Sequence, residues 1–337
     1  MKALVTGASG FLGSHLVARL VERGDSVRAL VRASSDVSYL KKLGVELAVG
    51  DVTDFDSLRS ACQGVDCVFH AAAMVTDWAP WSDFEAITIR GTENTLRATT
   101  EAGVSRFLDV STDGVYALGG LRGRVTEESP LEERFGRWDY YRRSKVAAER
   151  IAREYLESGR IGVSIVRPGV LLGERDRVML PGLMAFLRSP SAAYLGKGDN
   201  RLPYVYVGDV AEACILAATS EKGLGQTYNV ASSEEVTQRE LFLAVSEATG
   251  VPAPRRKMPL RLAYGLAFLM EVASVLAWRR VRPALTRFAI NLIALDYQED
   301  SSKAKRELGW KAQVSMREAI KRSVEWLEAR PARPVGG

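Results

Sequence analysis

Short runs rich in β-branched residues alternate with amphipathic helical patterns through the first 170 residues. Strands are predicted at residues 3–6, 27–31, 46–49, 67–70, 107–111 and 163–166. Between them, apolar residues recur every three to four positions, which predicts helices at 10–23, 55–62, 84–102 and 140–158. Strands and helices in strict alternation favour an α/β fold, with a doubly wound parallel sheet covered by helices on both faces.

The rhythm changes after Arg167-Pro168, where loops rich in Gly, Pro and Arg run to about Arg201. A strand-like PYVYV, a helix at 209–219 and a strand at 227–230 follow, and the remainder is mostly helical up to a last helix at 315–329. We therefore predict a sheet domain and a smaller, mostly helical C-terminal substrate lobe. The sheet domain comprises residues 1–170 with returns near 203–232; the lobe comprises 171–202 and 233–330, and the tail 331–337 is expected to be disordered.

The composition mainly excludes classes of protein and kinds of site. Hydrophobic residues make up 47% of the 337 residues and charged residues 26%, as in ordinary soluble proteins, and a net charge of +5 is too small to indicate nucleic-acid binding. The cysteines (Cys62, Cys67, Cys214) and histidines (His15, His70) are scattered, so neither a disulfide framework nor a metal site is expected. The chain starts directly with a strand pattern and has no long uncharged apolar run, so a cytoplasmic location without a membrane span is expected.

Three glycines follow the first predicted strand in TGASGFLGSH. Gly7, Gly10 and Gly13 stand three residues apart, a variant of the G-x-G-x-x-G pattern that binds dinucleotides. Glycine allows a tight turn and a close approach of the backbone to a phosphate, and the next helix points its free N–H groups there. The position between a strand and a helix favours dinucleotide binding over glycines that serve only a turn.

The end of the second predicted strand indicates which dinucleotide is bound. NAD binders carry an acidic residue there for the ribose 2′-hydroxyl, whereas an arginine suits the 2′-phosphate of NADP. Here Arg32 follows the strand, Ser34 and Ser35 add hydroxyls, and the nearest acids, Asp25 and Asp36, lie away from the strand end. We therefore favour NADP(H), with NAD(H) as the alternative; an exposed loop arginine would be the unremarkable interpretation.

Two tyrosines stand side by side in DYYRRSK, shortly before a lysine. A helix turns about 100° per residue, so Tyr141 and Lys145 lie about 40° apart, whereas Tyr140 and Lys145 lie about 140° apart. Only Tyr141 is therefore expected to share a site with Lys145. A nearby ammonium favours the phenolate and lowers its pKa, and the phenol can then exchange a proton with a ketone or an alcohol. Y-x-x-x-K alone is frequent by chance; its place after a dinucleotide turn gives it weight.

Hydroxyl side chains end the fifth predicted strand in LDVSTDGVYA. Ligands of a doubly wound sheet bind beyond the carboxyl ends of the strands, where Ser111 and Thr112 lie. A hydroxyl there can hold a substrate oxygen beside the tyrosine, although a simple cap of the strand end is the alternative.

Taken together, these segments resemble the extended short-chain dehydrogenase/reductase family. The matches are TGASGFLG, GDVTD, HAAA, GTENTL, STDGVY, Tyr141-x-x-x-Lys145 and RPGVLLG, over roughly residues 1–175, with weaker ones in PYVYVGDVAEA and TYNVAS. The resemblance implies a Rossmann-type fold, Tyr141 as acid/base, Lys145 also on the nicotinamide ribose, and Thr112, four residues before the Tyr of VY, as the hydroxyl that orients the substrate. It also implies a homodimer formed through the helices near 84–102 and 140–158.

The same resemblance implies a set of cofactor-binding residues. Asp51 and Val52 are expected near the adenine, and Ala71, Ala72 and Ala73 along the cofactor. The whole set is Gly7, Ser9, Gly10, Phe11, Leu12, Gly13, Arg32, Asp51, Val52, Ala71, Ala72, Ala73, Tyr141, Lys145, Pro168, Gly169 and Val170. No metal is implied.

Two positions depart from the family pattern. Thr88 in ITIRGT stands where the family commonly has asparagine, which puts an asparagine-supported proton relay in doubt. Gly114 in STDGVY replaces the glutamate of the sugar dehydratase pattern, and without that carboxylate we do not expect a dehydratase.

Within the family, VRALVR resembles dihydroflavonol reductases. The segments PLRLAYGLAFLMEV, PALTRF and DSSKAKRELGWKAQVSMREAIKRSVEWL resemble the 3β-hydroxysteroid dehydrogenase branch, which includes sterol-4-carboxylate 3-dehydrogenases and 2-alkyl-3-oxoalkanoate reductases, although epimerases share the last segment. This implies an NADP(H)-dependent oxidoreductase that interconverts a ketone and a secondary alcohol on a hydrophobic substrate. The alternatives are a nucleotide-sugar epimerase with a retained nicotinamide cofactor and, from another class, a cofactor-sensing regulator.

Residues 258–295 are unusually apolar, interrupted by Arg261 and Glu271 and followed by a basic cluster that includes Arg279, Arg280, Arg282 and Arg287. The favoured interpretation is a core helix or a wall of the substrate pocket. The alternative is a helix over 258–287 that lies in the membrane interface and holds the protein on the inner face of the membrane.

Overall fold

The computed structural model describes residues 1–117, 123–277 and 282–329. The predicted disorder of 331–337, and Arg279 and Arg280 of the basic cluster, lie outside the described residues. A seven-stranded sheet forms the centre, with the strand order β12-β7-β5-β4-β1-β2-β3 and every pairing parallel. The strands are β1 (Lys2–Thr6), β2 (Ser26–Val31), β3 (Glu46–Val49), β4 (Cys67–His70), β5 (Arg106–Val110), β7 (Gly162–Pro168) and β12 (Thr227–Val230). The predicted Rossmann-type α/β fold is confirmed.

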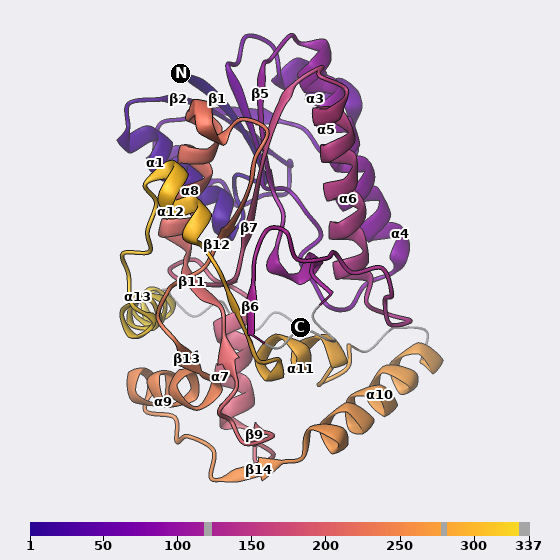
Figure 1. Cartoon of the computed structure of the whole chain (residues 1–337), viewed down its shortest axis with the longest axis vertical. Helices are drawn as coiled ribbons and strands as arrows, with labels where there is room; N and C mark the ends of the chain where they lie inside the picture. The colour runs from indigo at the N-terminus through magenta and orange to yellow at the C-terminus, as the bar shows by residue number, and fades with distance from the viewer. Residues whose placement is uncertain (118–122, 278–281, 330–337) are drawn as a thin grey trace.

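Helices cover both faces of this sheet (Figure 1). Ala3 and Val5 of β1 pack in one core layer with α1 (Phe11–Glu22) and α8 (Val207–Thr219). Leu4, between them, faces the opposite layer, which contains α3 (Phe55–Ala61), α5 (Gly91–Glu101) and α6 (Tyr140–Glu157). This alternation follows from the period of two along a strand, because both faces of a parallel sheet are buried.

The predicted helix over 84–102 is confirmed, with a π-helical stretch inside it. The structure has α4 (Trp81–Phe84), a π-helical stretch η1 (Glu85–Arg90), and only then α5. Within the wide π turn, Thr88 is buried and its hydroxyl accepts a 3.0 Å hydrogen bond from the backbone N–H of Met74. At the start of α5, a Cβ on Gly91 would lie 2.8 Å from Val52. These contacts with distant parts of the chain favour the interruption, and local periodicity does not reveal them.

Outside the central sheet, the chain forms two-stranded pairs and further helices. The pairs are β8 (Val170–Leu172) with β11 (Tyr204–Tyr206), β10 (Arg201–Leu202) with β13 (Val236–Thr237), β9 (Ala193–Leu195) with β14 (Arg256–Met258), and β6 (Gly123–Val125) with β15 (Tyr297–Glu299). The remaining helices are α2 (Ser38–Lys42), α7 (Met179–Arg188), α9 (Gln238–Thr249), α10 (Leu260–Leu276), α11 (Arg287–Ala294), α12 (Ser302–Leu308) and α13 (Met316–Glu328), with short 3-10 turns η2 (Asp113–Val115) and η3 (Glu221–Gly223). The division of the chain at residue 170 stays a prediction.

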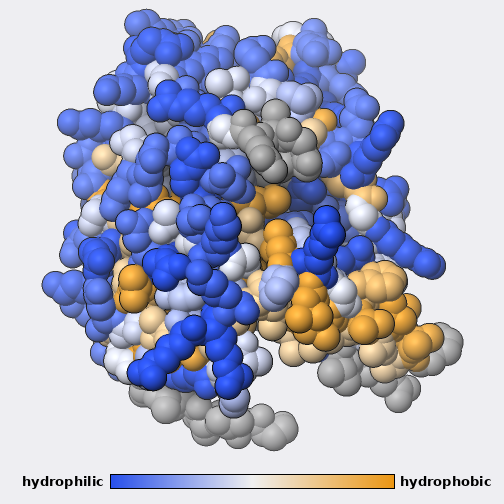
Figure 2. Space-filling model, turned by 60° about the horizontal axis from the view of Figure 1, so that its bottom comes forward, coloured by the Kyte–Doolittle hydropathy of each residue, from blue (hydrophilic) through white to orange (hydrophobic). Residues whose placement is uncertain are grey.

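Helix α10 turns its large apolar side chains outward. Its buried residues are the small or polar Ala263, Ala267, Glu271 and Ser274. Its exposed apolar residues are Leu262, Leu266, Phe268, Leu269, Met270 and Leu276. Figure 2 shows hydrophobic side chains gathered over this end of the molecule. The prediction of a core helix is therefore wrong for α10, because a narrow strip of small residues is what packs against α11. Within the described ranges, no helix is long and apolar enough to cross a membrane.

Candidate active site

The glycine turn between β1 and α1 is too tight for side chains. Gly7 has φ +66°, and a Cβ there would lie 2.8 Å from the backbone of Ala71. A Cβ on Gly13 would lie 2.1 Å from the carbonyl oxygen of Gly7, and the N–H of Gly10 donates to that same oxygen at 2.9 Å. Gly13 is therefore required by a contact within the turn itself, and Gly7 by its positive φ and the neighbouring backbone of Ala71.

The first turn of α1 is open to a bound anion. Gly10 is exposed, no side chain caps the helix, and the first turn carries no acidic residue. The N–H groups of Phe11 and Leu12 thus start a 12-residue helix with no competing carboxylate in that turn, and Ser9 lies half-buried beside them. The cradle fits the pyrophosphate of a nicotinamide dinucleotide.

The cofactor residues expected after β2, β3 and β4 differ in their surroundings. Arg32 is exposed, and no described side chain forms a hydrogen bond or ion pair with it. The carboxylate of Asp51 accepts from the N–H and hydroxyl of Thr53, while Val52 is buried. After β4, the N–H of Ala71 donates to the Thr6 carbonyl and that of Ala72 to the Thr6 hydroxyl, so this segment is fixed against the glycine turn; Ala73 follows, half-buried.

After β7, the predicted cofactor residues are already engaged with the protein. Pro168 ends the strand, the N–H of Gly169 donates to the Val230 carbonyl at 3.1 Å, and the N–H of Val170 donates to the Pro203 carbonyl at 2.7 Å. A Cβ on Gly169 would lie 2.3 Å from that Pro203 oxygen. The glycine therefore has a packing role here, and the N–H groups of this segment are used within the fold.

The structure separates the two tyrosines at the start of α6. The ring of Tyr141 packs edge-on against Phe288 of α11, with 5.4 Å between ring centroids. The ring of Tyr140 packs instead against Trp81 and Phe84 of α4, at 5.5 and 6.1 Å. Tyr141 is thus the one that faces the lobe, and Tyr140 belongs to the packing of the helical layer.

The electrostatics of Tyr141 run opposite to the prediction. Burial raises the pKa of Tyr141 to about 12, a hydrogen bond with Thr112 acts to lower it, and the Asp113 carboxylate raises it further. Lys145 is buried and donates from Nζ to the carbonyl of Val110 at 2.6 Å. Burial lowers the pKa of Lys145, opposed by the charges of Asp109 and Glu149. The expected lowering of the Tyr141 pKa by Lys145 is therefore not found in this structure, where burial is the largest influence on the pKa of the phenol.

The two hydroxyls that follow β5 have different roles. Ser111 is buried and donates to Glu149 Oε2 at 2.6 Å, so it is engaged away from the site. Thr112 Oγ1 accepts from the N–H of Gly114 at 3.2 Å, donates to Asp113 Oδ1 at 3.1 Å, and interacts with Tyr141. Thr112 thus caps the chain after β5, as the alternative interpretation held, and it also lies beside the phenol of Tyr141.

Behind this site lies a buried polar network that sequence analysis missed. Arg167 is 1% exposed, yet it donates from Nε to Glu149 Oε2 at 3.0 Å and from Nη1 to the hydroxyl of Tyr116 at 2.7 Å. That hydroxyl in turn donates to Asn229 of β12 at 2.5 Å. The signal was available, since Glu149 stands one helical turn after Lys145. The network ties α6 to β7 and β12, which fixes the helix that carries Tyr141.

A second missed group lies on the other side of Thr112. Asp113 is buried and accepts a 2.6 Å hydrogen bond from the hydroxyl of Tyr297. Glu299, two residues on, is also buried, and neither of its carboxylate oxygens has a hydrogen-bond partner among the described residues. Burial raises the pKa of both Asp113 and Glu299. Burial therefore opposes the ionised form of both carboxyl groups, while the hydrogen bonds from Tyr297 and Thr112 act to lower the pKa of Asp113.

Aromatic rings gather on the lobe side of the site, next to α10 and α11. Besides Phe288, Trp138 stacks on Phe268 of α10 at 6.1 Å, and Trp78 meets Trp138 edge-on at 6.0 Å. The guanidinium of Arg287 lies over Trp138 and Phe268 while donating to the buried Glu271 at 2.7 Å. This side of the site is consequently apolar, with its charges paired.

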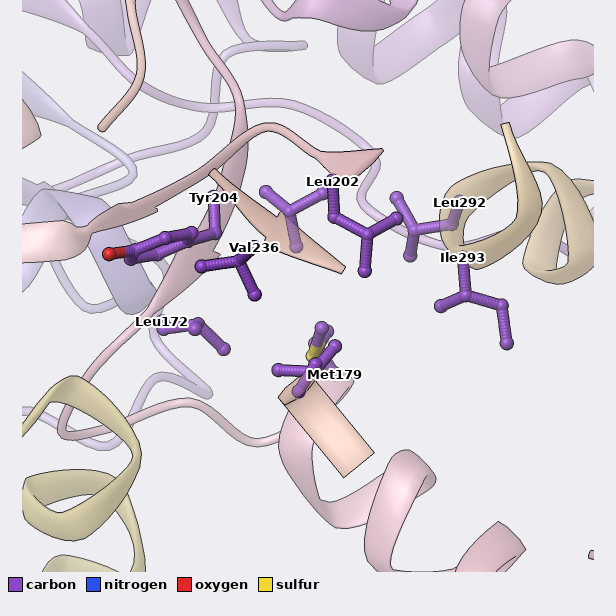
Figure 3. Close-up of a pocket in the computed structure, with 9 residues that line it drawn as sticks. Leu172, Met179, Leu202, Tyr204, Val236, Leu292 and Ile293 are labelled. Carbon is purple, nitrogen blue, oxygen red and sulfur yellow. The ribbon is translucent and has the colours of Figure 1, made fainter. Parts of the chain in front are cut away.

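Two small cavities lie away from this chemistry. One, of about 10 Å³, is lined by apolar residues of the lobe that include Leu172, Met179 and Leu292 (Figure 3). That volume is close to the minimum for one water molecule, so it is a packing gap. The other, about 30 Å³, is polar and adjoins Glu299. Neither is lined by Thr112, Tyr141 or Lys145.

The histidines have structural roles. His70 lies between the hydroxyls of Thr6 and Thr92, and burial lowers its pKa to about 3. Burial also lowers the pKa of His15 to about 3. Within the part of the chain that the structure describes, no group of histidine, cysteine or acidic side chains could hold a metal ion.

The profile of the NAD dependent epimerase/dehydratase family matches residues 3–231, which include the glycine turn, Thr112, Tyr141 and Lys145. The chain belongs to this family. It is an NAD(P)-dependent enzyme of the extended short-chain dehydrogenase/reductase type, as the reductases and dehydrogenases among its relatives also support.

Relatives span nearly the whole chain. The 2-alkyl-3-oxoalkanoate reductase of Shewanella oneidensis is 28% identical over 331 residues, which cover 95% of this chain and 84% of the relative. The 3 beta-hydroxysteroid dehydrogenase/Delta 5-->4-isomerase of Mycobacterium tuberculosis is 30% identical over 341 residues, which cover 95% of this chain and 88% of the relative. A dTDP-glucose 4,6-dehydratase of Streptomyces venezuelae, solved with NAD, is 26% identical with a TM-score of 0.76, covering 98% of this chain and 97% of the other.

Proposed function

We propose that this epimerase/dehydratase family member is an NADP(H)-dependent oxidoreductase that interconverts a ketone and a secondary alcohol on a hydrophobic substrate. The observation that carries the proposal is the position of Tyr141 on the same face of α6 as Lys145, with Thr112 and the aromatic ring of Phe288 beside its phenol. Arg32, exposed and without an acidic neighbour at the end of β2, supports NADP(H).

The residues of this chain divide the work as follows. The nicotinamide, when bound, supplies or accepts the hydride. Thr112 holds the substrate oxygen through its hydroxyl, and Tyr141 donates its proton to that oxygen as negative charge develops there. Lys145, fixed by Val110, lies one turn along the same helix face and would hold the ribose. The same phenol can donate a proton to a carbonyl oxygen or, once deprotonated, accept one from an alcohol, so Tyr141 serves both directions of the reaction.

The apolar wall supports the class of substrate. Phe288, Trp138 and Phe268 offer carbon surface to a ligand next to Tyr141, and the nearby charges of Arg287 and Glu271 neutralise each other. Two relatives carry names that describe 2-alkyl-3-oxoalkanoate reduction and 3β-hydroxysteroid dehydrogenation, both with carbonyl or hydroxyl groups on apolar skeletons. A long-chain 3-oxo acid or a sterol fits this wall better than a charged nucleotide sugar does.

The deciding experiment is a screen that follows NADPH and NADH absorbance with 3-oxo acids, 3-keto and 3β-hydroxy sterols, and UDP-sugars. Turnover of an apolar ketone or alcohol with matching consumption or formation of NADPH is expected. A UDP-sugar epimer formed without net change in NADPH would establish the alternative, a nucleotide-sugar epimerase. Cofactor binding without turnover on any substrate would point to a cofactor-sensing regulator.

The outward face of α10 supports a second part of the proposal, peripheral association with an anionic membrane surface. Its only acidic residue, Glu271, is buried and paired with Arg287. The exposed basic stretch Arg255–Lys257 immediately precedes the helix, and Arg261 is exposed in its first turn. Apolar side chains beside basic ones match the acyl chains and headgroups of an anionic lipid surface. An apolar substrate could then pass between the lipid and the site.

We also propose a homodimer through the outer surface of α5 and α6. The exposed residues of these helices are charged, among them Glu93, Arg97, Arg150 and Glu154, and both signs are present for pairing across a twofold axis. Sedimentation velocity on wild type and on the Arg97→Glu/Arg150→Glu variant tests this. A dimer that becomes monomeric in the variant supports the interface, and a wild-type monomer contradicts it.

A further inference from the structure

The loop between β8 and α7 reaches across to the adenosine end of the cofactor site. Arg175, in this loop, donates from Nε to the hydroxyl of Ser14 in α1 at 2.8 Å. Its guanidinium also lies over the ring of Tyr39 in α2, 4.2 Å from the centroid. Arg177, two residues on, forms a 3.5 Å ion pair with Asp36 in the segment between β2 and α2. The loop thus lies against that segment, which starts at Arg32.

Arg175 lacks the partner that a half-buried cation ordinarily has. No described carboxylate forms an ion pair with it, and its contacts are a hydroxyl and an aromatic ring. Burial lowers its pKa, which means that the surroundings do not fully compensate the charge. A guanidinium carries five N–H donors, and Ser14 and Tyr39 leave part of them for an anion.

Arg175 has an unusual backbone conformation within a rigid loop. Arg175 is the one described residue other than glycine with a positive φ, +73°. The next residue fixes the loop, because the buried carboxylate of Asp176 accepts from the N–H groups of Val178, Met179 and Leu180 at 2.7–3.0 Å. A strained position that persists in a rigid loop indicates a function for its side chain.

In this fold the 2′ position of the adenosine ribose lies at the end of β2, beside the glycine turn. Arg32 borders that place from the β2 side. Arg175 borders it from the other side, because Ser14 stands one helical turn after Gly10 and Tyr39 belongs to the helix that follows the β2 loop. A dianionic phosphate between two guanidiniums is a strong arrangement for charge-assisted hydrogen bonds.

We propose that Arg175 is a second cation for the 2′-phosphate of NADP(H), supplied to the cofactor site by the β8–α7 loop. This rests on the proposed preference for NADP(H) and gives it a structural basis beyond Arg32. It also joins cofactor choice to the lobe, because the same loop leads into α7, whose Met179 lies in the lobe core.

The test compares ligands that differ only in this phosphate. Affinities for 2′,5′-ADP and 5′-AMP are measured by calorimetry, and those for NADPH and NADH by nicotinamide fluorescence, so that no turnover is needed. Arg175→Gly removes the guanidinium and suits the positive φ, so the loop keeps its conformation. Arg177→Gln is the matched control, because Arg177 is an exposed arginine of the same loop. Arg32→Gln probes the proposed preference itself.

Arg175→Gly should weaken 2′,5′-ADP and NADPH by roughly ten- to a hundred-fold, the effect of losing a hydrogen bond to a charged group. Affinities for 5′-AMP and NADH should change less than about twofold, as should all affinities of Arg177→Gln. Equal loss for ligands with and without the phosphate, or no loss, overturns the role of Arg175. If wild type discriminates NADPH from NADH and only Arg32→Gln abolishes this discrimination, the role of Arg175 is wrong but the NADP(H) preference holds. If wild type does not discriminate, the NADP(H) preference is wrong.

Discussion

Tyr141 and Lys145 stand one turn apart on the same face of α6, yet the Lys145 ammonium is directed to the Val110 carbonyl, 2.6 Å away. The phenol has its pKa raised to about 12 by burial, with Thr112 as the opposing contact. The proton donor of the proposed reaction is therefore the tyrosine held between Thr112 and Phe288, and the lysine is held by the backbone of β5.

Replacing Tyr141 should separate chemistry from packing. Tyr141→Phe removes the proton donor, and we expect kcat for the apolar ketone to fall by roughly a hundred- to ten-thousand-fold. NADPH affinity should stay within about twofold. Tyr140→Phe is the matched control, because Tyr140 packs with Trp81 and Phe84 and should leave kcat nearly unchanged. Comparable turnover by both variants would sink the assignment of Tyr141.

The buried Asp109 should leave a mark on stability against pH. Burial raises its pKa from 3.8 to about 6, opposed by the charge of Lys145. Because the folded state binds the proton more tightly than the unfolded state, this group stabilises the fold fully below pH 4 and the contribution is lost as pH rises through 6. The difference corresponds to about 3 kcal/mol.

Urea unfolding at pH values from 4 to 8 measures this contribution. We expect the free energy of unfolding of Asp109→Asn to lack the change between pH 4 and 6 that Asp109 causes in wild type. Asp56→Asn, at a carboxylate whose side chain is 83% exposed, should leave the slope unchanged. An Asp109→Asn profile that runs parallel to wild type would contradict the raised pKa.

Replacing each of two helical glycines by alanine should change the stability of the fold in opposite directions. Gly13→Ala places a Cβ 2.1 Å from the Gly7 carbonyl, so the turn must open, which we expect to cost about 1–3 kcal/mol and to abolish cofactor binding. Gly265→Ala lies in the middle of α10, where a Cβ meets nothing within 4 Å, and should stabilise by about 0.5–1 kcal/mol. Thermal unfolding and NADPH fluorescence give both readings; a Gly13→Ala variant that still binds cofactor would contradict the cradle.

The exposed face of α10 should govern membrane binding. Leu269 and Leu276 are 63% and 76% exposed, and Leu269→Glu/Leu276→Glu should reduce the fraction bound to phosphatidylglycerol vesicles at least about tenfold. Val49→Glu, at a valine of β3 that is 70% exposed, should leave binding unchanged. Wild type should float with anionic vesicles and much less with phosphatidylcholine vesicles. No flotation by wild type, or a dimer that only the α10 variant loses, would show that something else covers this face.

The sequence alone determined the architecture and which of the two tyrosines shares a helix face with Lys145. Strand-length apolar runs and helical periods follow from local geometry, so β1 to β5, β7, α1, α3, α6 and the helical stretch that ends with α5 were predicted to within a few residues, whereas the short α2 was not predicted. The glycine spacing likewise determined the turn between β1 and α1, since contacts among Gly7, Gly10 and Gly13 are local.

Only the tertiary structure decided what lies around those residues. The π-helical stretch and the start of α5 depend on Met74 and Val52, which meet them from the segments after β4 and β3. The outward apolar face of α10 could not be read from its composition, because which strip of a nearly uniform apolar helix is buried depends on its neighbour α11.

The charges of the site were decided in the same way. The pKa of Tyr141 rises because burial outweighs the hydrogen bond with Thr112, and burial is a property of the folded chain as a whole. Arg175 stands more than 150 residues from Ser14 along the chain and meets it only when the loop after β8 closes over α1. Local periodicity specifies elements; the environment of a charge arises only where distant segments come together.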